Sequence, residues 1–269
     1  MPEQKKGFTI DLEHIIAAKF GGRKLPGPLL RFLKRFLHID YLNAFFEKGY
    51  EGVEFCTEAV KYLGVTLDVK GLENIPADGT RYTFACNHPL GGIDGVALAS
   101  LVGTAFGSVG ALMNDFLLAV PGLRPLGIPV NKVGSQARNL VSLVNDIFQS
   151  DKQIMIFPAG LCSRKIDGKI QDLPWTKTFI TQSKASGRKI VPVFFDAVNS
   201  PRFYRIARLR KKLGIKFNIE MITLPDEMYR ARGQHFTVRF GTPVPPEFFN
   251  SSKTPLQWAA WVREQVYQI

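Results

Sequence analysis

From residue 65 onward, short apolar segments typical of strands alternate with longer segments that have helical periodicity. The clearest strand segments are VTLDV at 65–69, RYTFAC at 81–86, QIMIFP at 153–158, KIVPVFF at 189–195 and HFTVRF at 235–240. Strands separated by helices pair mainly in parallel and carry helices on both faces. The sequence therefore predicts the α/β class: one domain with a mixed, largely parallel sheet flanked by helices.

Single residues predict further details of this domain. Asp94 and Ser135 are expected to cap the helices that follow them, since Asp and Ser are favoured N-caps. Pro192 indicates an edge strand or a bulge, because proline has no N–H to donate to a sheet. The segment KFNIEMITL at 216–224 is expected to add a strand, and a last helix is expected to begin near Pro255.

Residues 1–64 lack this alternation and are predicted to form an amphipathic helical extension before the domain at 65–269. One helix is expected from Leu29 to Gly49 and a second from 52 to 63. In the first of them the cations share one face and the apolar side chains share the other: Arg31, Lys34 and Arg35 against Leu29, Phe32, Leu33, Phe36 and Leu37. This pattern is typical of helices that lie on a membrane surface.

The charge of the chain favours an anionic partner. There are 35 lysines and arginines against 23 aspartates and glutamates, a net charge of +12. A lipid headgroup, an acidic carrier protein, a nucleotide cofactor or a nucleic acid fits this excess, and a merely basic soluble enzyme is the alternative. The stretch from Ser200 to Lys216 has seven cations and no acid, interleaved with Phe203, Tyr204 and Leu209. We interpret it as a basic helix at a lipid interface, against a solvated helix face or a nucleic-acid patch.

Two features concern membrane topology and compartment. The stretch from Gly95 to Met113 carries no charge and approaches the length of a membrane span. Its glycines and hydroxyl side chains favour a buried helix followed by a buried strand. Three cysteines without C-x-x-C spacing argue against a disulfide framework and fit a reducing compartment, and the first residues lack the pattern of a signal peptide.

The segment ACNHPLGGIDG at 85–95 is the first with clear chemical content. His88 follows a strand, at the carboxyl edge where α/β sheets bind ligands, and Gly91–Gly92 allow a sharp turn. Asp94, folded back onto the imidazole, would fix its tautomer and stabilise the imidazolium. A histidine that only caps the turn is one alternative, and a thiol nucleophile at Cys86 is another. None of the four histidines has zinc-ligand spacing.

The segment IFPAGLCSRK at 156–165 runs from a buried strand into a turn and a basic cluster. Arg164 carries a guanidinium that can bind a phosphate or a carboxylate through two parallel hydrogen bonds. A solvated basic loop is the alternative interpretation of this segment.

Together the two segments resemble the motifs of the lysophospholipid acyltransferase family, which comprises glycerophosphate and acylglycerophosphate acyltransferases. Asn87, His88 and Asp94 match its Asn-His-(four residues)-Asp motif, and FPAGLCSR approximates its Phe-Pro-Glu-Gly-Thr-Arg-Ser motif. The chain differs from these motifs in two ways: five residues separate His88 from Asp94, and Ala159 replaces the glutamate. In both respects it resembles a haemolysin-like branch of amino-acid-lipid O-acyltransferases. That branch is linked to acylation of the hydroxyl of N-(3-hydroxyacyl) amino acids, as in ornithine and glycine lipids.

The resemblance implies acyl transfer to a lyso-lipid hydroxyl, with His88 as general base, Asp94 orienting it and N–H groups near Gly91–Gly92 stabilising the oxyanion. It implies substrate contacts by Asn87, Gly91, Gly92, Asn131, Lys132, Phe157, Pro158, Gly160, Ser163, Arg164 and Lys165. No metal and no bound cofactor are expected, and the acyl donor is acyl carrier protein or a coenzyme A thioester. The alternatives are a 1-acyl-sn-glycerol-3-phosphate acyltransferase and a non-enzymatic, membrane-active haemolysin-like protein.

The partners implied are a membrane lipid surface, the thioester donor and a lyso-lipid acceptor, and nucleic acid is not expected. The location implied is the cytoplasmic face of the inner membrane, with the protein peripheral or monotopic. Residues 65–269 would then form the acyltransferase domain.

Overall fold

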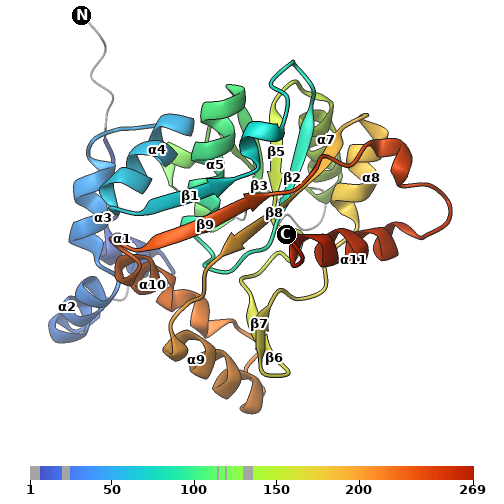
Figure 1. Ribbon diagram of the computed structural model, residues 1–269. Coiled ribbons are helices and arrows are strands. Elements are labelled where there is room, and N and C mark those ends of the chain that lie inside the picture. The colour runs from blue at the N-terminus through green and yellow to red at the C-terminus, as the bar shows by residue number, and fades with distance from the viewer. Residues whose placement is uncertain (1–6, 20–24, 114, 119, 130–135) are drawn as a thin grey trace, which may run out of the picture.

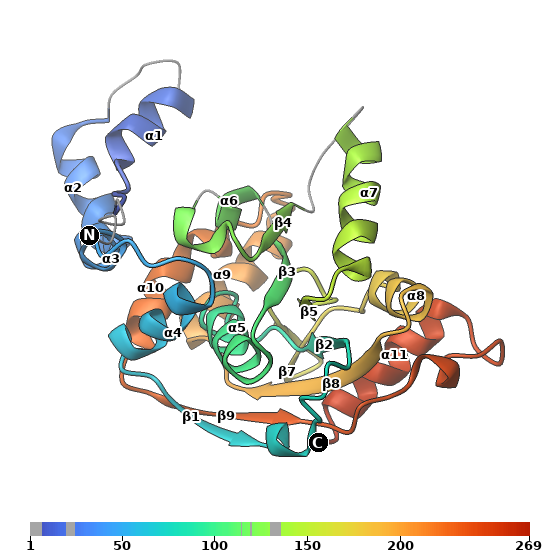
Figure 2. The same ribbon diagram turned by 90° about the horizontal axis from the view of Figure 1, so that it is seen from above.

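The computed structural model describes residues 7–19, 25–113, 115–118, 120–129 and 136–269. Within them, one sheet has the strand order β1-β9-β8-β2-β5-β3-β4, and helices cover both of its faces (Figure 1 and Figure 2). Every neighbouring pair of strands is parallel except β8 and β9. The predicted mixed, largely parallel sheet flanked by helices is confirmed.

The bounds of the elements follow the chain. The strands of the sheet are β1 Thr66–Lys70, β2 Tyr82–Cys86, β3 Val109–Met113, β4 Gly127–Pro129, β5 Gln153–Ile156, β8 Lys189–Asp196 and β9 His235–Phe240. A separate hairpin pairs β6 Arg164–Ile166 with β7 Lys169–Gln171. The helices are α1 Leu12–Lys19, α2 Gly27–Phe36, α3 Ile39–Phe46, α4 Gly52–Tyr62, α5 Ile93–Phe106, α6 Asp115–Leu118, α7 Gln136–Gln149, α8 Thr178–Ala185, α9 Pro201–Lys212, α10 Leu224–Arg230 and α11 Pro255–Val266. Short 3-10 turns are η1 Leu72–Asn74, η2 Pro121–Leu123, η3 Ile219–Thr223 and η4 Pro246–Phe248.

The strand β2 is fully buried and divides the core in two. Phe84 and Cys86 belong to the larger cluster, which α3, α4 and α5 complete, whereas Ala85 belongs to a second cluster with α8 and α11. Alternate residues of a strand point to opposite faces of the sheet, so a strand covered on both faces needs a nearly continuous apolar run. The residues of interest for function follow the carboxyl end of this strand.

Two further predictions for the domain are confirmed. The uncharged stretch from Gly95 to Met113 forms most of α5 and the buried strand β3. No helix in the described ranges is long and apolar enough to cross a membrane. The last helix begins at Pro255 with a capping box, in which Thr254 and Gln257 satisfy each other's backbone N–H groups. Ser135, the predicted cap of α7, lies outside the described residues.

The single helix predicted from Leu29 to Gly49 is two helices, α2 and α3, which meet at His38. His38 has a left-handed backbone conformation with φ 51°, which interrupts the helical path. Its imidazole Nε2 lies 2.8 Å from Asp226 Oδ1, and its ring stacks on Tyr229. The break is therefore held by contacts with a distant part of the chain.

The N-terminal region joins the domain more closely than the sequence predicts. Helices α3 and α4 contribute Phe45, Phe46, Phe55 and Cys56 to the larger core cluster. Helix α2 has no buried residue, and α1 and α2 project from the body of the molecule in Figure 2. The part that stands apart is thus α1 with α2, which is shorter than the predicted extension of residues 1–64.

Pro192 does not lie at an edge of the sheet. It belongs to β8, between β2 and β9. Strand β9 ends at Phe240, which pairs with Val193, and the Gly241 N–H donates to the Pro192 carbonyl. The missing N–H of Pro192 therefore falls just past the end of the paired β9, which explains how an interior strand accommodates a proline.

The strand predicted at 216–224 is also absent from the described sheet. The segment forms η3 and then begins α10. Glu220 turns into the protein to meet Arg164 and Arg210, and Pro225 suits the first turn of a helix. Burial of one carboxylate between two arginines thus overrides the apolar character that suggested a strand.

The basic stretch forms helix α9, as predicted, but its aromatic residues face inward. Phe203 and Tyr204 are buried and form a small core cluster with Cys162. The exposed apolar side chains are Leu209 near the end of the helix and Leu213 just after it. A lipid-facing surface on α9 would therefore lie at its carboxyl end and not along its whole length.

Candidate active site

His88 and Asp94 form a hydrogen-bonded pair at the carboxyl end of β2. His88 Nδ1 lies 2.9 Å from Asp94 Oδ2, and the residues between them make the turn that joins β2 to α5. The Asp94 side chain is fully buried, whereas that of His88 is 17% exposed. Because Nδ1 makes this contact, Nε2 remains on the other side of the ring, and it forms no hydrogen bond within the described part of the chain.

The Asp94 carboxylate is held by backbone N–H groups. The sequence predicts Asp94 as the N-cap of α5, but this prediction is wrong. Gly92 has the N-cap position, and Asp94 lies in the first turn of the helix. Its Oδ2 accepts hydrogen bonds from the N–H groups of Leu90 and Gly91 at 2.9 and 3.2 Å, and Oδ1 accepts one from Gly95. The Gly91 N–H is thus engaged with Asp94 here, and the oxyanion contact near Gly91–Gly92 stays a prediction. These donors favour the charged form of the carboxyl group.

The turn between the two residues depends on glycine at one position. Gly91 has φ 78°, a conformation that side chains with a Cβ rarely adopt. A Cβ at Gly91 would overlap Cys162 Sγ and lie 3.1 Å from Leu224 Cδ1. At Gly92, in contrast, a Cβ would meet no described atom within 4 Å. The turn is therefore closed on the Gly91 side and open at Gly92.

The pair shifts the pKa values of both partners. Burial alone would lower the pKa of His88, but the charge and hydrogen bond of Asp94 outweigh it, so the pKa is raised above the ordinary 6.5. Burial would raise the pKa of Asp94, but His88 and the backbone N–H groups outweigh it, so that pKa is lowered. The arrangement therefore keeps Asp94 charged and makes the imidazole a good proton acceptor.

The second informative segment folds over His88. The Phe157 ring stacks on the imidazole with centroids 4.3 Å apart. Gly160 closes a turn in which its N–H donates to the Phe157 carbonyl, and Pro158 is buried behind this turn. The Ser163 N–H donates to the His88 carbonyl at 2.7 Å. The tertiary structure thus brings together the two segments that the resemblance places in one site.

Two residues just before His88 were considered for functional roles: Asn87 as a substrate contact and Cys86 as an alternative nucleophile. The Asn87 side chain accepts from the Phe195 N–H at 2.6 Å and donates to the Phe195 carbonyl at 3.0 Å, which joins the ends of β2 and β8. Both functions of the amide are used within the protein, and the substrate contact of Asn87 stays a prediction. Burial raises the pKa of the Cys86 thiol well above its usual range. A nucleophile must be a thiolate, so Cys86 does not fit the thiol mechanism.

Arg164 and Lys165 lie on the hairpin strand β6 and not in a solvated loop. Neighbouring strand residues point to opposite faces, so the two side chains do not form one cationic cluster. The Arg164 guanidinium donates to Glu220 Oε1 at 2.9 Å and to the carbonyls of Cys162 and Ser163 at 2.6 and 3.3 Å. Lys165 is exposed. The headgroup contact of Arg164 stays a prediction, because here its guanidinium is occupied within the protein.

A buried carboxylate at Asp172 was missed from the sequence. It accepts hydrogen bonds from the His88 N–H at 3.1 Å and from the Ser163 hydroxyl at 2.6 Å. The usable signal is Asp167–Gly168, a dipeptide typical of two-residue hairpin turns. Both residues have positive φ and join β6 to β7, and this hairpin returns the chain to the site at Asp172.

Glu220 was also missed, because the segment around it was expected to be a strand. Its carboxylate is fully buried between Arg164 and Arg210, with nitrogen–oxygen distances of 2.9 Å to each. The predicted substrate contacts Asn131 and Lys132 lie outside the described residues. Within the described ranges, no group of three or more histidines, cysteines, aspartates or glutamates has a geometry that holds a metal.

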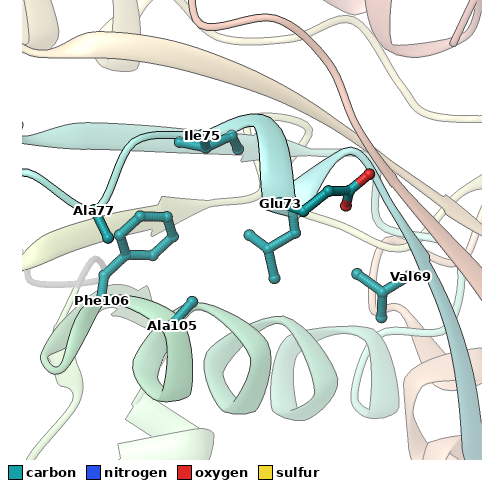
Figure 3. Close-up of a pocket in the computed structure, with 7 residues that line it drawn as sticks. Val69, Glu73, Ile75, Ala77, Ala105 and Phe106 are labelled. Carbon is teal, nitrogen blue, oxygen red and sulfur yellow. The ribbon is translucent and has the colours of Figure 1, made fainter.

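Figure 3 shows an apolar pocket of about 400 Å³ whose lining does not include His88. Its lining residues come from β1, the segment after it and the end of α5: Val69, Leu72, Glu73, Ile75, Ala77, Ala105 and Phe106. Asp94 lies in the first turn of α5 and Phe106 in its last, and a helix of this length spans about 20 Å. The pocket is therefore at the opposite end of α5 from the His88–Asp94 pair.

The geometry of the pair fits a general base. An imidazole whose Nδ1 is held by a buried carboxylate, and whose Nε2 has no hydrogen bond to a described residue, can take the proton of a hydroxyl that attacks a carbonyl. The raised pKa of His88 suits this role, because the charge of Asp94 makes the imidazole a stronger proton acceptor. The expected reaction class is acyl transfer to a hydroxyl group.

Comparisons with known proteins identify the family of the chain. The family model for acyltransferases matches residues 15–269. Lyso-glycine lipid O-acyltransferases from Bacteroides thetaiotaomicron and Phocaeicola vulgatus are each 45% identical over 267 residues, which cover 97% of this chain and 98% and 95% of those proteins. The fold is similar to the crystal structure of the 1-acyl-sn-glycerophosphate acyltransferase PlsC from Thermotoga maritima, with a TM-score of 0.50, 17% identity, and coverage of 88% of this chain and 94% of that chain. The chain therefore belongs to the acyltransferase family and is an enzyme that transfers acyl groups.

Proposed function

We propose that this enzyme transfers a fatty acyl chain from a thioester to the hydroxyl of an N-(3-hydroxyacyl)glycine, which is a lyso-glycine lipid. The observation that carries the chemistry is the His88–Asp94 pair, in which Nδ1 is bound and Nε2 has no hydrogen bond to any residue that the structure describes. The choice of acceptor is supported by the names of two relatives that are 45% identical over nearly the whole chain. Among the amino-acid lipids, the glycine lipid is therefore favoured over the ornithine lipid.

In the proposed reaction the acceptor hydroxyl lies beside Nε2 of His88. The imidazole takes the hydroxyl proton as the oxygen attacks the thioester carbonyl carbon. Asp94, held by three backbone N–H groups, keeps Nδ1 protonated and stabilises the imidazolium. The carbon–sulfur bond then breaks, and His88 returns its proton to the departing sulfur. The products are an ester and a free thiol, and no acyl-enzyme is needed.

The donor in this proposal is acyl carrier protein or acyl-coenzyme A. Both are anionic, which the net charge of +12 supports. The basic helix α9 lies beside the site, because the Arg164 guanidinium is 5.3 Å from the centroid of the Phe203 ring. The proposed location is the cytoplasmic face of the inner membrane, and the free cysteines of the described residues suit that reducing compartment.

Exposed apolar side chains support docking of the enzyme on a lipid surface. Phe32 of α2 is 62% exposed, and Leu213 and Phe217, which follow α9, are 63% and 66% exposed. The Arg202 guanidinium of α9 lies 5.4 Å from the centroid of the Phe36 ring of α2, so the two helices are neighbours. Co-sedimentation with anionic vesicles tests this surface. Phe217→Glu should weaken binding, and unchanged binding in that variant would contradict the docking proposal.

The experiment that tests the acceptor measures transfer of a labelled fatty acyl chain from acyl carrier protein to three lyso-lipids. They are N-(3-hydroxyacyl)glycine, the corresponding ornithine compound and lysophosphatidic acid. We expect the highest kcat/KM with the glycine compound. An N-acylglycine without the 3-hydroxyl is the matched control, and it should give no product because it has no oxygen to acylate. A higher kcat/KM with lysophosphatidic acid would favour the phospholipid alternative instead.

A further inference from the structure

A second buried carboxylate, Asp172, contacts the backbone of His88. It directly follows β7 and is only 1% exposed. The His88 N–H lies 3.1 Å from its Oδ1 and 3.3 Å from its Oδ2. The Ser163 hydroxyl donates to Oδ1 at 2.6 Å, and the Trp175 indole N–H donates to Oδ2 at 2.9 Å. Both carboxylate oxygens are thus committed to the segment that carries His88 and to its neighbours.

The charge of this carboxylate acts on the imidazole. The three groups that donate to Asp172 are all neutral, and no ion pair among the described residues involves its carboxylate. A buried charge without a cationic partner acts over a longer range than one that is neutralised, because the interior screens it weakly. Asp172 accordingly contributes, after Asp94, to raising the pKa of His88.

The same carboxylate belongs to a closed set of contacts around His88. Ser163 donates its N–H to the His88 carbonyl at 2.7 Å and its hydroxyl to Asp172. The end of helix α11 contacts the backbone of Asp172. The Asp172 N–H donates to the hydroxyl of Tyr267, the C-cap of this helix, at 2.8 Å, and Arg263 donates to the Asp172 carbonyl at 2.9 Å. The N–H and the C=O of His88 are therefore both fixed by a segment that lies far away in sequence.

We propose that Asp172 is a positioning residue for acyl transfer, which holds the His88 backbone where Nε2 meets the acceptor hydroxyl and stabilises the imidazolium that forms there. This inference rests on the proposed role of His88 as general base. Asp94 orients the imidazole from within the turn, whereas Asp172 fixes the backbone from 84 residues away. A displacement of about 1 Å at a reacting group costs about 100-fold in rate, so a contact of this kind has a measurable effect.

The test compares Asp172→Asn with Tyr267→Phe in the full-length enzyme. Asparagine removes the charge of the side chain. It also replaces one carboxylate oxygen, which accepts a hydrogen bond, with an NH₂ group that would face one of the donors around Asp172. Tyr267→Phe removes a hydrogen bond to the Asp172 backbone and leaves the contact of the carboxylate with His88 intact. Both variants should lose some thermal stability. Only Asp172→Asn should lower kcat, by about 10- to 100-fold, with KM for both substrates within about threefold.

A second readout does not depend on the acceptor. The titration of His88 can be followed by NMR in the free enzyme, with its signal identified by its absence in His88→Asn. We expect Asp172→Asn to lower the pKa of His88 and Tyr267→Phe to leave it unchanged. Because no substrate is present, this readout remains decisive even if the proposed acceptor is wrong.

The outcomes separate positioning from a merely structural role. If Asp172→Asn and Tyr267→Phe reduce kcat and stability equally and leave the His88 titration unchanged, the proposal is overturned. Asp172→Glu retains the charge but moves the carboxylate oxygens. This variant tests positioning even if Asp172→Asn does not fold. We expect it to lower kcat while the His88 pKa stays raised, and a kcat equal to that of the unmodified enzyme would contradict positioning by Asp172.

Discussion

Two His–Asp pairs in the described part of the molecule have nearly the same separation but different surroundings. At the proposed active site, His88 Nδ1 lies 2.9 Å from Asp94 Oδ2. At the junction of α2, α3 and α10, His38 Nε2 lies 2.8 Å from Asp226 Oδ1. The first pair uses Nδ1 of the imidazole and leaves Nε2 without a hydrogen bond to any described residue. The second pair uses Nε2, which is the nitrogen that takes the acceptor proton in the proposed reaction.

The carboxylates of the two pairs also differ. Asp226 forms ion pairs with Arg202 and Arg230 in addition to His38, and the His38 ring stacks on Tyr229 at 3.6 Å between centroids. Its carboxylate is therefore paired with two guanidinium groups as well as hydrogen-bonded to His38. Asp94 receives neutral backbone N–H groups instead, so its full charge remains for the imidazolium of His88. The two pairs are thus not distinguished by their His–Asp distance. The proposed general base has a free Nε2 among the described residues and a carboxylate that accepts only neutral N–H groups besides the imidazole, whereas the structural pair has neither.

The largest expected effect comes from replacing the two histidines in the same way. His88→Asn should reduce acyl transfer by about 10²- to 10⁴-fold, because general-base catalysis is lost. His38→Asn should change the rate by less than about threefold, since asparagine tolerates the left-handed conformation at that position. Steady-state kinetics with the same donor and acceptor measure both. Comparable losses in the two variants would remove the distinction between the pairs.

The next comparison replaces the two aspartates and adds a pH profile. Acyl transfer needs neutral His88, so kcat/KM should rise with pH through a pKa above 6.5. In Asp94→Asn burial acts on His88 without the opposing charge, so the acidic limb should move to lower pH, and kcat should fall on the order of 10²-fold. Asp226→Asn should leave the limb in place and lower the free energy of unfolding by about 1–3 kcal/mol. A limb that moves equally in both variants would contradict the separate roles.

The smallest expected effect sharpens how the first pair acts. If His88 activates the acceptor directly, Cys86→Ala should keep the acyl transfer rate within about twofold, because the thiol is buried and its pKa is well above its usual range. If His88 instead activates a thiol, the loss should match that of His88→Asn. Single-turnover measurement of acyl transfer, with a search for acylated protein by mass spectrometry, decides between the two.

The active-site pair could be predicted because its determinants are local. His88, Gly91 and Asp94 lie within one short turn, and the left-handed conformation of Gly91 folds the carboxylate back onto the ring. The buried strand before them shows itself as an apolar run. Turn formation and strand burial both depend on residues that are near each other in sequence, so a motif of a few residues contains the information.

The second pair could not be predicted, because its partners are remote. The segment around His38 has a continuous helical pattern, yet a contact with Asp226, 188 residues away, stabilises a break there. In the same way the segment around Glu220 has the apolar character of a strand, but pairing with Arg164 and Arg210 determines its path. Local preferences of a few tenths of a kcal/mol per residue yield to such buried contacts.

By itself, the sequence determined the alternation of most strands and helices after residue 65, the family and the His88–Asp94 pair, since periodicity and turn preference act between neighbouring residues. Only the tertiary structure decided that Asp172 holds the His88 backbone, that Asn87 joins two strand ends and that the aromatic residues of α9 face inward. The physical reason is that buried polar groups are strongly favoured to find hydrogen-bond partners, and packing decides which distant residue is close enough to supply one.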